Sequence, residues 1–125
     1  MKNLKNAYVL DACIWPENGR FKGMSEDYKE SLLDACFLTL DGTDFRTGVE
    51  CLGQVSELTD DPAERIRIAR TYDDLMKNKA DGYKSLILYF QDPAPLENKL
   101  YVAKAFYEMG VRVIQMSYNK GGYIG

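Results

Sequence analysis

The sequence predicts an α/β fold in which four parallel strands alternate with crossover helices. In the stretch from Tyr83 to Asn119, an apolar run, a turn, a segment of helical periodicity, a glycine and a second apolar run follow one another. Two strands joined by a helix in this way are typical of a right-handed βαβ crossover with parallel strands. Two further apolar runs, Ala7–Ile14 and Ala35–Leu40, precede this unit. The length of 125 residues suits a single α/β domain spanning residues 1–125.

The first predicted strand, Ala7–Ile14, places Asp11 near its C-terminal end. Turn residues follow from Trp15, and we expect the loop to continue through Gly23. Ser25 is then a candidate N-cap for a short helix that ends near Leu33.

The second predicted strand, Ala35–Leu40, stops at an Asp-Gly pair. Asp44 is placed to cap a helix whose apolar residues share one face: Phe45, Val49, Leu52 and Val55. A further helix is predicted to open at Asp60-Asp61-Pro62, to run to about Asn78 and to end near Gly82.

The third strand, Ser85–Phe90, is short and apolar, which is typical of a strand buried on both faces. Gln91-Asp92-Pro93 ends it, because proline cannot continue a central ladder. Gly110 suits a helix C-cap, and Val111–Met116 is the fourth strand. The helix between these strands has one apolar stripe: Leu96, Leu100, Ala103 and Phe106. Lys120–Gly125 is expected to be a flexible loop.

Two architectures fit four such strands: an open parallel sheet, and half of a (β/α)8 barrel, whose full form needs about 250 residues. In both, the active site lies at the C-terminal ends of the strands. No glycine-rich phosphate loop follows the first strand, so the half-barrel interpretation is favoured. The polar residues expected at or just beyond the strand ends are Asp11, Asp41, Gln91, Asp92, Ser117 and Asn119.

Composition excludes several kinds of function. The chain has no histidine, which removes Ser-His-Asp and Cys-His catalysis and the commonest zinc ligand. A net charge of −3 gives no basic field for nucleic acid, and no apolar run has the length of a membrane span. Three widely spaced cysteines indicate reduced thiols, so we expect a cytoplasmic protein.

Three segments resemble the membrane (renal) dipeptidase family of metal-dependent barrel hydrolases. LILYFQDPAPLENKL resembles the family's third strand and the loop leaving it, and AFYEMGVRVIQMSYN resembles a helix end and the fourth strand. The opening VLDAC resembles the first strand, which in active members continues Asp-Gly-His-x-Asp. The resemblance is strongest at Leu86–Asn119, and it covers only the N-terminal half of a family barrel.

The resemblance also implies a degenerate metal site. In active members the His and Asp after the first strand bind metal, and here Cys13 and Trp15 occupy those positions. The Glu that bridges two metals at the end of the third strand is replaced by Gln91, which keeps a carbonyl acceptor but lacks the charge. The remaining family ligands come from later strands. Zinc is therefore implied only by the family, with an incomplete ligand set, and Cys13 is the one residue here that offers it a thiolate.

We therefore expect a split or truncated dipeptidase-like protein that is not active as this chain alone. Metal-dependent hydrolysis of a dipeptide or related small amide would require a second chain, either another copy or a complementary one, to complete the site. The alternative is a non-catalytic subunit for assembly or small-molecule binding. In either case we expect the residues that line the pocket for a polar, amino-acid-like ligand to be Asp11, Gln91, Tyr118 and Asn119.

Overall fold

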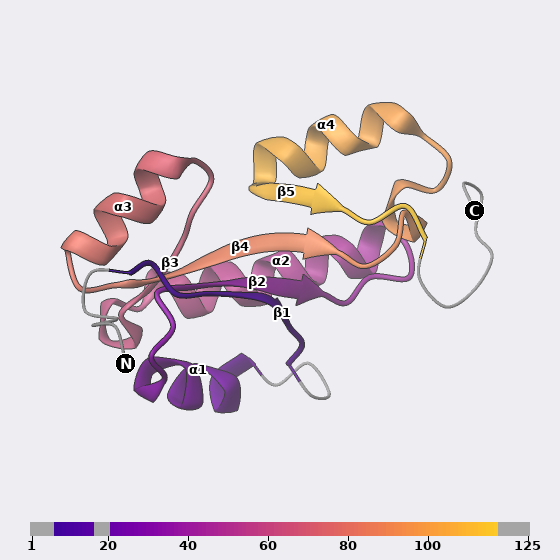
Figure 1. The fold of residues 1–125 in the computed structure, drawn as a ribbon. Helices are drawn as coiled ribbons and strands as arrows, with labels where there is room; N and C mark the ends of the chain where they lie inside the picture. Colours follow the sequence, from indigo (N-terminus) through magenta and orange to yellow (C-terminus); the bar gives the residue numbers. More distant parts are fainter. Residues whose placement is uncertain (1–6, 17–20, 118–125) are drawn as a thin grey trace.

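The computed structural model describes residues 7–16 and 21–117, and it confirms the parallel α/β arrangement (Figure 1). The sheet contains β1 (Leu10–Ile14), β2 (Ala35–Leu40), β3 (Ile66–Ile68), β4 (Lys84–Phe90) and β5 (Val111–Ile114). Every pairing is parallel, and β2 lies between β1 and β4. Both β3 and β5 pair with β4, the first near its beginning and the second near its end. The four predicted strands are thus neighbours in chain order, as consecutive strands of a (β/α)8 barrel are.

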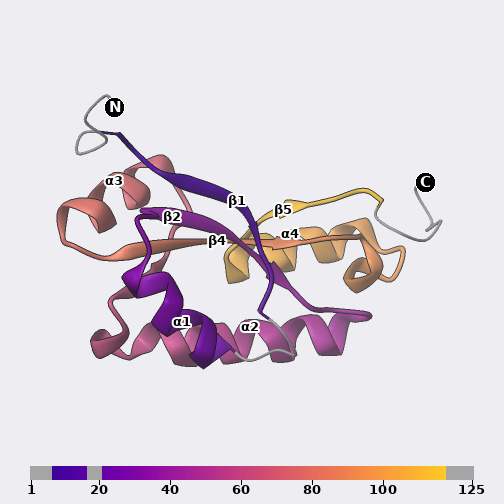
Figure 2. The same cartoon turned by 60° about the horizontal axis from the view of Figure 1, so that its bottom comes forward.

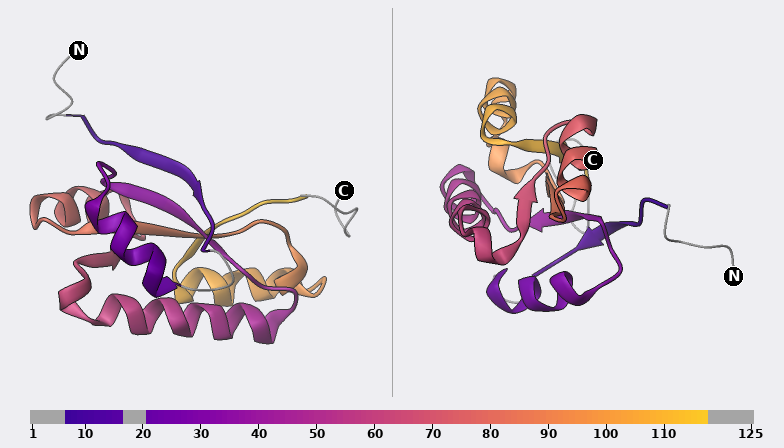
Figure 3. Two further views of the ribbon diagram at one scale, coloured as in Figure 1. Left: turned by 90° about the horizontal axis from the view of Figure 1, so that it is seen from below. Right: turned by 90° about the vertical axis from the view of Figure 1, so that its left-hand side faces the viewer.

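The helices are α1 (Phe21–Glu30), α2 (Phe45–Asp60), α3 (Tyr72–Ala80) and α4 (Leu100–Met109), with 3-10 turns η3 (Pro62–Glu64) and η4 (Ala94–Leu96). Figure 2 shows α1 and α2 below the sheet and α3 above it. The right-hand view of Figure 3 shows the strands along an arc, with α4, α2 and α1 on the outer side and α3 on the inner side. The outer position of α4, α2 and α1 is that of the helices in a (β/α)8 barrel, whereas α3 inside the arc departs from it.

The core lies between the sheet and its outer helices. Side chains alternate across the strands, so Leu38, Leu88 and Phe90 join this core while their neighbours point to the inner face. Phe90 and Phe106 of α4 pack edge to face, with ring centroids 4.9 Å apart and planes at 74°. Both rings are almost fully buried, and they hold the end of β4 against α4.

Helix α3 covers the beginning of the inner face of the sheet. The Asn78 side-chain amide donates to Ser85 Oγ at 3.0 Å, and both residues are buried. Lys79 Nζ lies 2.8 Å from Asp34 Oδ2, which also accepts the backbone N–H of Val9. These polar contacts close the N-terminal ends of the strands and leave the C-terminal ends as the open end of the inner face.

The predicted helix from Asp60-Asp61-Pro62 to Asn78 is wrong as a single element. Pro62 opens only the short turn η3, because Arg65 adopts a left-handed conformation (φ 54°) that ends it. Residues Ile66–Ile68 then form β3, and the alternation of its two isoleucines is the pattern of a strand. Helix α3 begins only after Thr71, whose side chain accepts the N–H of Asp74 in a capping box.

Three smaller expectations need correction. Strand β1 begins at Leu10 instead of Ala7, so Asp11 is near its beginning and not near its C-terminal end. Ser25 is not an N-cap, because α1 already begins at Phe21 and Ser25 is buried inside it. Leu100 is exposed and does not belong to the buried stripe of α4.

Other predicted features are confirmed. Asp44 caps α2 through a capping box with Thr47, and Gly110 caps α4 with φ 114°. Within the described residues, no helix is both long and apolar enough to cross a membrane. The predicted loop Lys120–Gly125 lies outside the described residues.

Candidate functional site

The C-terminal ends of β1, β2 and β4 bring a group of polar side chains together. Strands β2 and β4 pair in register, with Thr39 opposite Tyr89 and Leu40 opposite Phe90. Because alternate residues face opposite sides, Thr39 and Tyr89 point to the inner face when Leu40 and Phe90 point to the core. The neighbouring strand β1 contributes Cys13 to this inner face.

Four of these residues form one hydrogen-bonded cluster, which we call the strand-end cluster: Cys13, Thr39, Tyr89 and Gln91. Thr39 Oγ1 donates to the Tyr89 hydroxyl at 2.7 Å, and the Gln91 amide nitrogen lies 3.4 Å from the same oxygen. Cys13 Sγ lies 3.0 Å from the Tyr89 hydroxyl and 4.0 Å from the Gln91 nitrogen. Residues 78 positions apart in the sequence thus meet at one place.

The Tyr89 hydroxyl is the centre of this cluster. It accepts from Thr39 and Gln91, so its own hydrogen is directed to the sulfur of Cys13. Burial, together with the hydrogen bond to Cys13, raises the pKa of Tyr89 above its ordinary value of 10.0. The phenol is therefore protonated at neutral pH and acts as a hydrogen-bond donor, not as a base.

Gln91 directly follows β4, as the sequence predicts. Its amide nitrogen is directed at Tyr89 and Cys13, which leaves its carbonyl oxygen to accept from a ligand N–H. The uncharged amide therefore offers one acceptor at the open end of the strands.

Of the other predicted site residues, one is engaged with its own backbone instead of facing a ligand, and two are not described. Asp11 Oδ1 accepts the backbone N–H of Cys13 at 2.9 Å, so this carboxylate holds the conformation of its own strand. Tyr118 and Asn119 lie outside the described residues.

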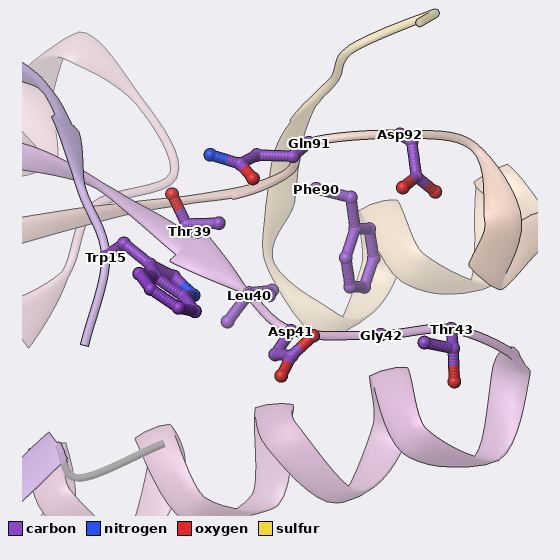
Figure 4. Close-up of a pocket in the computed structure, with 9 residues that line it drawn as sticks. All are labelled: Trp15, Thr39, Leu40, Asp41, Gly42, Thr43, Phe90, Gln91 and Asp92. Atoms are coloured by element: carbon purple, nitrogen blue, oxygen red, sulfur yellow. The ribbon is translucent and has the colours of Figure 1, made fainter. Parts of the chain in front are cut away.

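Beside the strand-end cluster is a hollow of about 140 Å³, which we call the strand-end hollow (Figure 4). Figure 4 shows the Gln91 side chain extending toward Thr39, and the indole of Trp15 directed toward the Leu40–Asp41 side. Its volume is below the range of about 300–1,000 Å³ that is typical of sites for drug-sized ligands, so it suits a small group. The polar or aromatic side chains that line it include Trp15, Thr39, Asp41, Thr43, Gln91 and Asp92.

The three cysteines differ sharply in their surroundings. Burial raises the pKa of Cys36 to about 12 and also raises the pKa of Cys51, and neither thiol reaches the surface. Cys13 is exposed, and none of the three is in a disulfide. Of the three thiols, only that of Cys13 can therefore be reached by a ligand at the strand ends.

The donor set does not fit the paired metal ions of the family that the sequence resembles. Within the described part of the chain, no three His, Cys, Asp or Glu side chains are grouped so as to hold a metal ion. The three positions that would supply ligands are a thiol, an indole and an amide: Cys13, Trp15 and Gln91. An indole offers no metal ligand, and an amide lacks the charge that holds two cations together.

Sequence reasoning identified Gln91 but missed Thr39 and Tyr89. Both lie in runs dominated by apolar residues, which gave no sign of a polar role. The alternation of side chains along a strand could have identified them. Thr39 and Tyr89 each precede the last residue of one of two neighbouring strands, and they therefore share a face of the sheet.

Comparison with solved structures finds a similar fold in parts of known barrel proteins. The fold is similar to the crystal structure of an amidohydrolase from Pseudomonas aeruginosa, with a TM-score of 0.79 and 23% identity over 94% of this chain. It is also similar to dipeptidase AC, described as a metallopeptidase of family M19, with a TM-score of 0.63 and 14% identity over 86% of this chain. No protein-family profile and no curated protein sequence matches the chain significantly. The chain spans 36% and 41% of the lengths of those two structures, and its fold is that of part of an amidohydrolase or dipeptidase barrel.

Proposed function

We propose that this chain is a dipeptidase-like partial barrel, one α/β domain over residues 1–125, that binds a small polar or amino-acid-like ligand at its strand ends. The observation that carries the proposal is the strand-end cluster, in which hydroxyl, thiol and amide groups converge beside a hollow. Convergent polar groups at the C-terminal ends of parallel strands are the usual setting of a ligand site in such folds. The three thiols outside disulfides agree with a reducing, cytoplasmic setting.

The binding role rests on what the neutral groups offer a ligand. The Gln91 carbonyl accepts an N–H from an amide or amine, while its nitrogen is held by Tyr89. Thr39 and Tyr89 are buried and bonded to each other, so they fix the position of Gln91 without competing for the ligand. This arrangement favours an uncharged amide or peptide group over a metal ion.

The test is an affinity comparison between two glutamine variants. The neutral probe N-acetylglycinamide is titrated into the full 125-residue chain, and binding is followed through the indole N–H signal of the single tryptophan, Trp15. Gln91→Ala should weaken binding by about tenfold, the cost of one lost hydrogen bond that leaves a ligand group unpaired. Gln54→Ala, a matched change at an exposed position of α2, should leave the affinity unchanged.

Equal affinities of the Gln91→Ala variant and the unchanged chain would overturn this assignment of Gln91. Absence of binding in the unchanged chain would overturn the proposed function as a whole.

A second function, metal-dependent hydrolysis of a dipeptide or small amide, is favoured by the open edges of the sheet. Among the described residues, β1 pairs only with β2, and β5 pairs only with β4. A barrel closes when such edges pair, so strands from a second copy or from a complementary chain would sit where further ligands belong. Any His donors must come from that source, because this chain has no histidine.

Light scattering with elemental analysis of the same peak separates the two functions. A dimer or a complex that contains stoichiometric zinc would support hydrolysis at a shared site, and dipeptide hydrolysis is then the assay. A metal-free species that binds N-acetylglycinamide would support binding alone.

A further inference from the structure

The strand-end hollow has an electrostatic character that the strand-end cluster lacks. Two of its lining residues, Asp41 and Asp92, carry carboxylates, and none of the described residues that line it is a lysine or arginine. Within the described residues, neither carboxylate takes part in an ion pair. The hollow is therefore a small concave site of negative charge at the strand ends.

The two carboxylates have different local roles. Asp92 Oδ1 accepts the backbone N–H of Ala94 at 2.8 Å, which fixes the turn after β4. Asp41 directly follows β2, is exposed and lines the hollow. Asp41 is thus the carboxylate better placed to meet a ligand from solvent.

Trp15 adds a second feature that favours a cation. Its side chain is 57% exposed although it lines the hollow, and Figure 4 shows the indole directed toward the Leu40–Asp41 side. The face of an indole attracts cations more strongly than any other aromatic side chain does. An indole beside a carboxylate offers an ammonium group both a cation–π contact and an opposite charge.

We infer that the strand-end hollow selects ligands that carry a cationic group, with an ammonium group seated between Trp15 and Asp41 and an adjoining amide at Gln91. This inference rests on the proposed function and narrows its ligand class to small amines with a neighbouring amide. A carboxylate ligand would face the negative charge of Asp41 and Asp92, and no described residue of the lining carries a positive charge to offset it. A volume of about 140 Å³ limits the bound part to about one amino-acid residue.

Three probes of similar size and different charge test the inference. Glycinamide is a cation, N-acetylglycinamide is neutral and N-acetylglycine is an anion. Each is titrated into the full chain, and the indole N–H resonance of Trp15 reports binding at this place, because the chain has one tryptophan. We expect glycinamide to bind about five- to tenfold more tightly than N-acetylglycinamide, and the anion to bind most weakly.

A pair of charge-removing variants provides the control. Asp41→Asn should reduce the preference for glycinamide over N-acetylglycinamide by about threefold or more. Asp60→Asn removes the same charge at the far end of α2, about 24 Å of helix away, and should leave the preference unchanged. Raising the salt concentration should reduce the preference strongly in the unchanged chain and less in the Asp41→Asn variant, which keeps only Asp92.

The outcomes separate this inference from the proposed function. Equal binding of glycinamide and N-acetylglycinamide would overturn the inference and leave the proposed function intact. An unaltered preference in the Asp41→Asn variant would also overturn it. No binding of any probe would overturn both.

Discussion

Replacing Gly48 in α2 tests the packing that holds the end of β4 and thus the strand-end cluster. A Cβ atom at this position would lie 3.2 Å from Cζ of Phe90 and 3.2 Å from Cζ of Phe106. Both rings are buried and packed on each other, so neither can move away easily. Phe90 also lines the strand-end hollow, which makes this contact part of the support of the site.

Gly53 of the same helix provides the matched control. A Cβ atom there meets nothing within 4 Å, and the residue is exposed. Alanine is favoured over glycine inside a helix by about 1 kcal/mol, and this gain applies to both positions. The difference between the two variants therefore isolates the cost of overpacking, which is about 1–3 kcal/mol.

The assay is urea unfolding followed by far-ultraviolet circular dichroism. Gly53→Ala should raise the free energy of unfolding by about 0.5–1 kcal/mol, and Gly48→Ala should fall below Gly53→Ala by about 1–3 kcal/mol. Equal stabilisation by the two alanines would refute the close packing of α2 against the two phenylalanines.

Two further predictions concern the thiols and the acid dependence of stability. In the folded protein, Cys13 should react rapidly with a thiol reagent, and this rapid reaction should be absent in the Cys13→Ser variant. Cys36 and Cys51 should react only on unfolding, because both are buried and burial raises the pKa of both thiols. Burial acts to raise the pKa of Asp34, but hydrogen bonds from Lys79 and the Val9 backbone lower it below the ordinary value of 3.8 by a larger amount. Because the unfolded state then binds the proton more tightly, this stabilisation is present above pH 3.8 and is lost as the pH falls below it. Asp34→Asn should cost about 1 kcal/mol at pH 7 and flatten the acid limb of a stability profile measured by urea unfolding, and an unchanged limb would contradict the Lys79–Asp34 contact.

The central strands were predictable because their burial leaves a strong pattern. Strands β2 and β4 are continuous apolar runs covered on both faces, and the predicted bounds Ala35–Leu40 and Ser85–Phe90 agree with the structure to within one residue. The capping roles of Asp44 and Gly110 were equally local, since each depends on one side chain or one backbone conformation.

Strand β3 could not be separated from its surroundings in the same way. It has only three residues, and the prolines and carboxylates around it resemble a helix start. What decides its state is pairing with β4, a contact that the local sequence does not contain.

The candidate site was predictable only where a residue stands at a strand end. Gln91 could be placed because it directly follows an apolar strand. Its role depends on the hydrogen bonds that its amide nitrogen donates to Tyr89 and Cys13, and Cys13 lies on a strand far away in the sequence. The register of β1 against β2, which is irregular after Asp11, sets that contact, and no sequence pattern specifies such an irregularity.

The most direct test of the account is a map of backbone amide resonances during titration with N-acetylglycinamide. A ligand bound as proposed should shift the resonances at the ends of β1, β2 and β4, in the residues of the strand-end cluster and the strand-end hollow. Shifts gathered on the outer helices, with the strand ends unchanged, would contradict a ligand site at this end of the partial barrel.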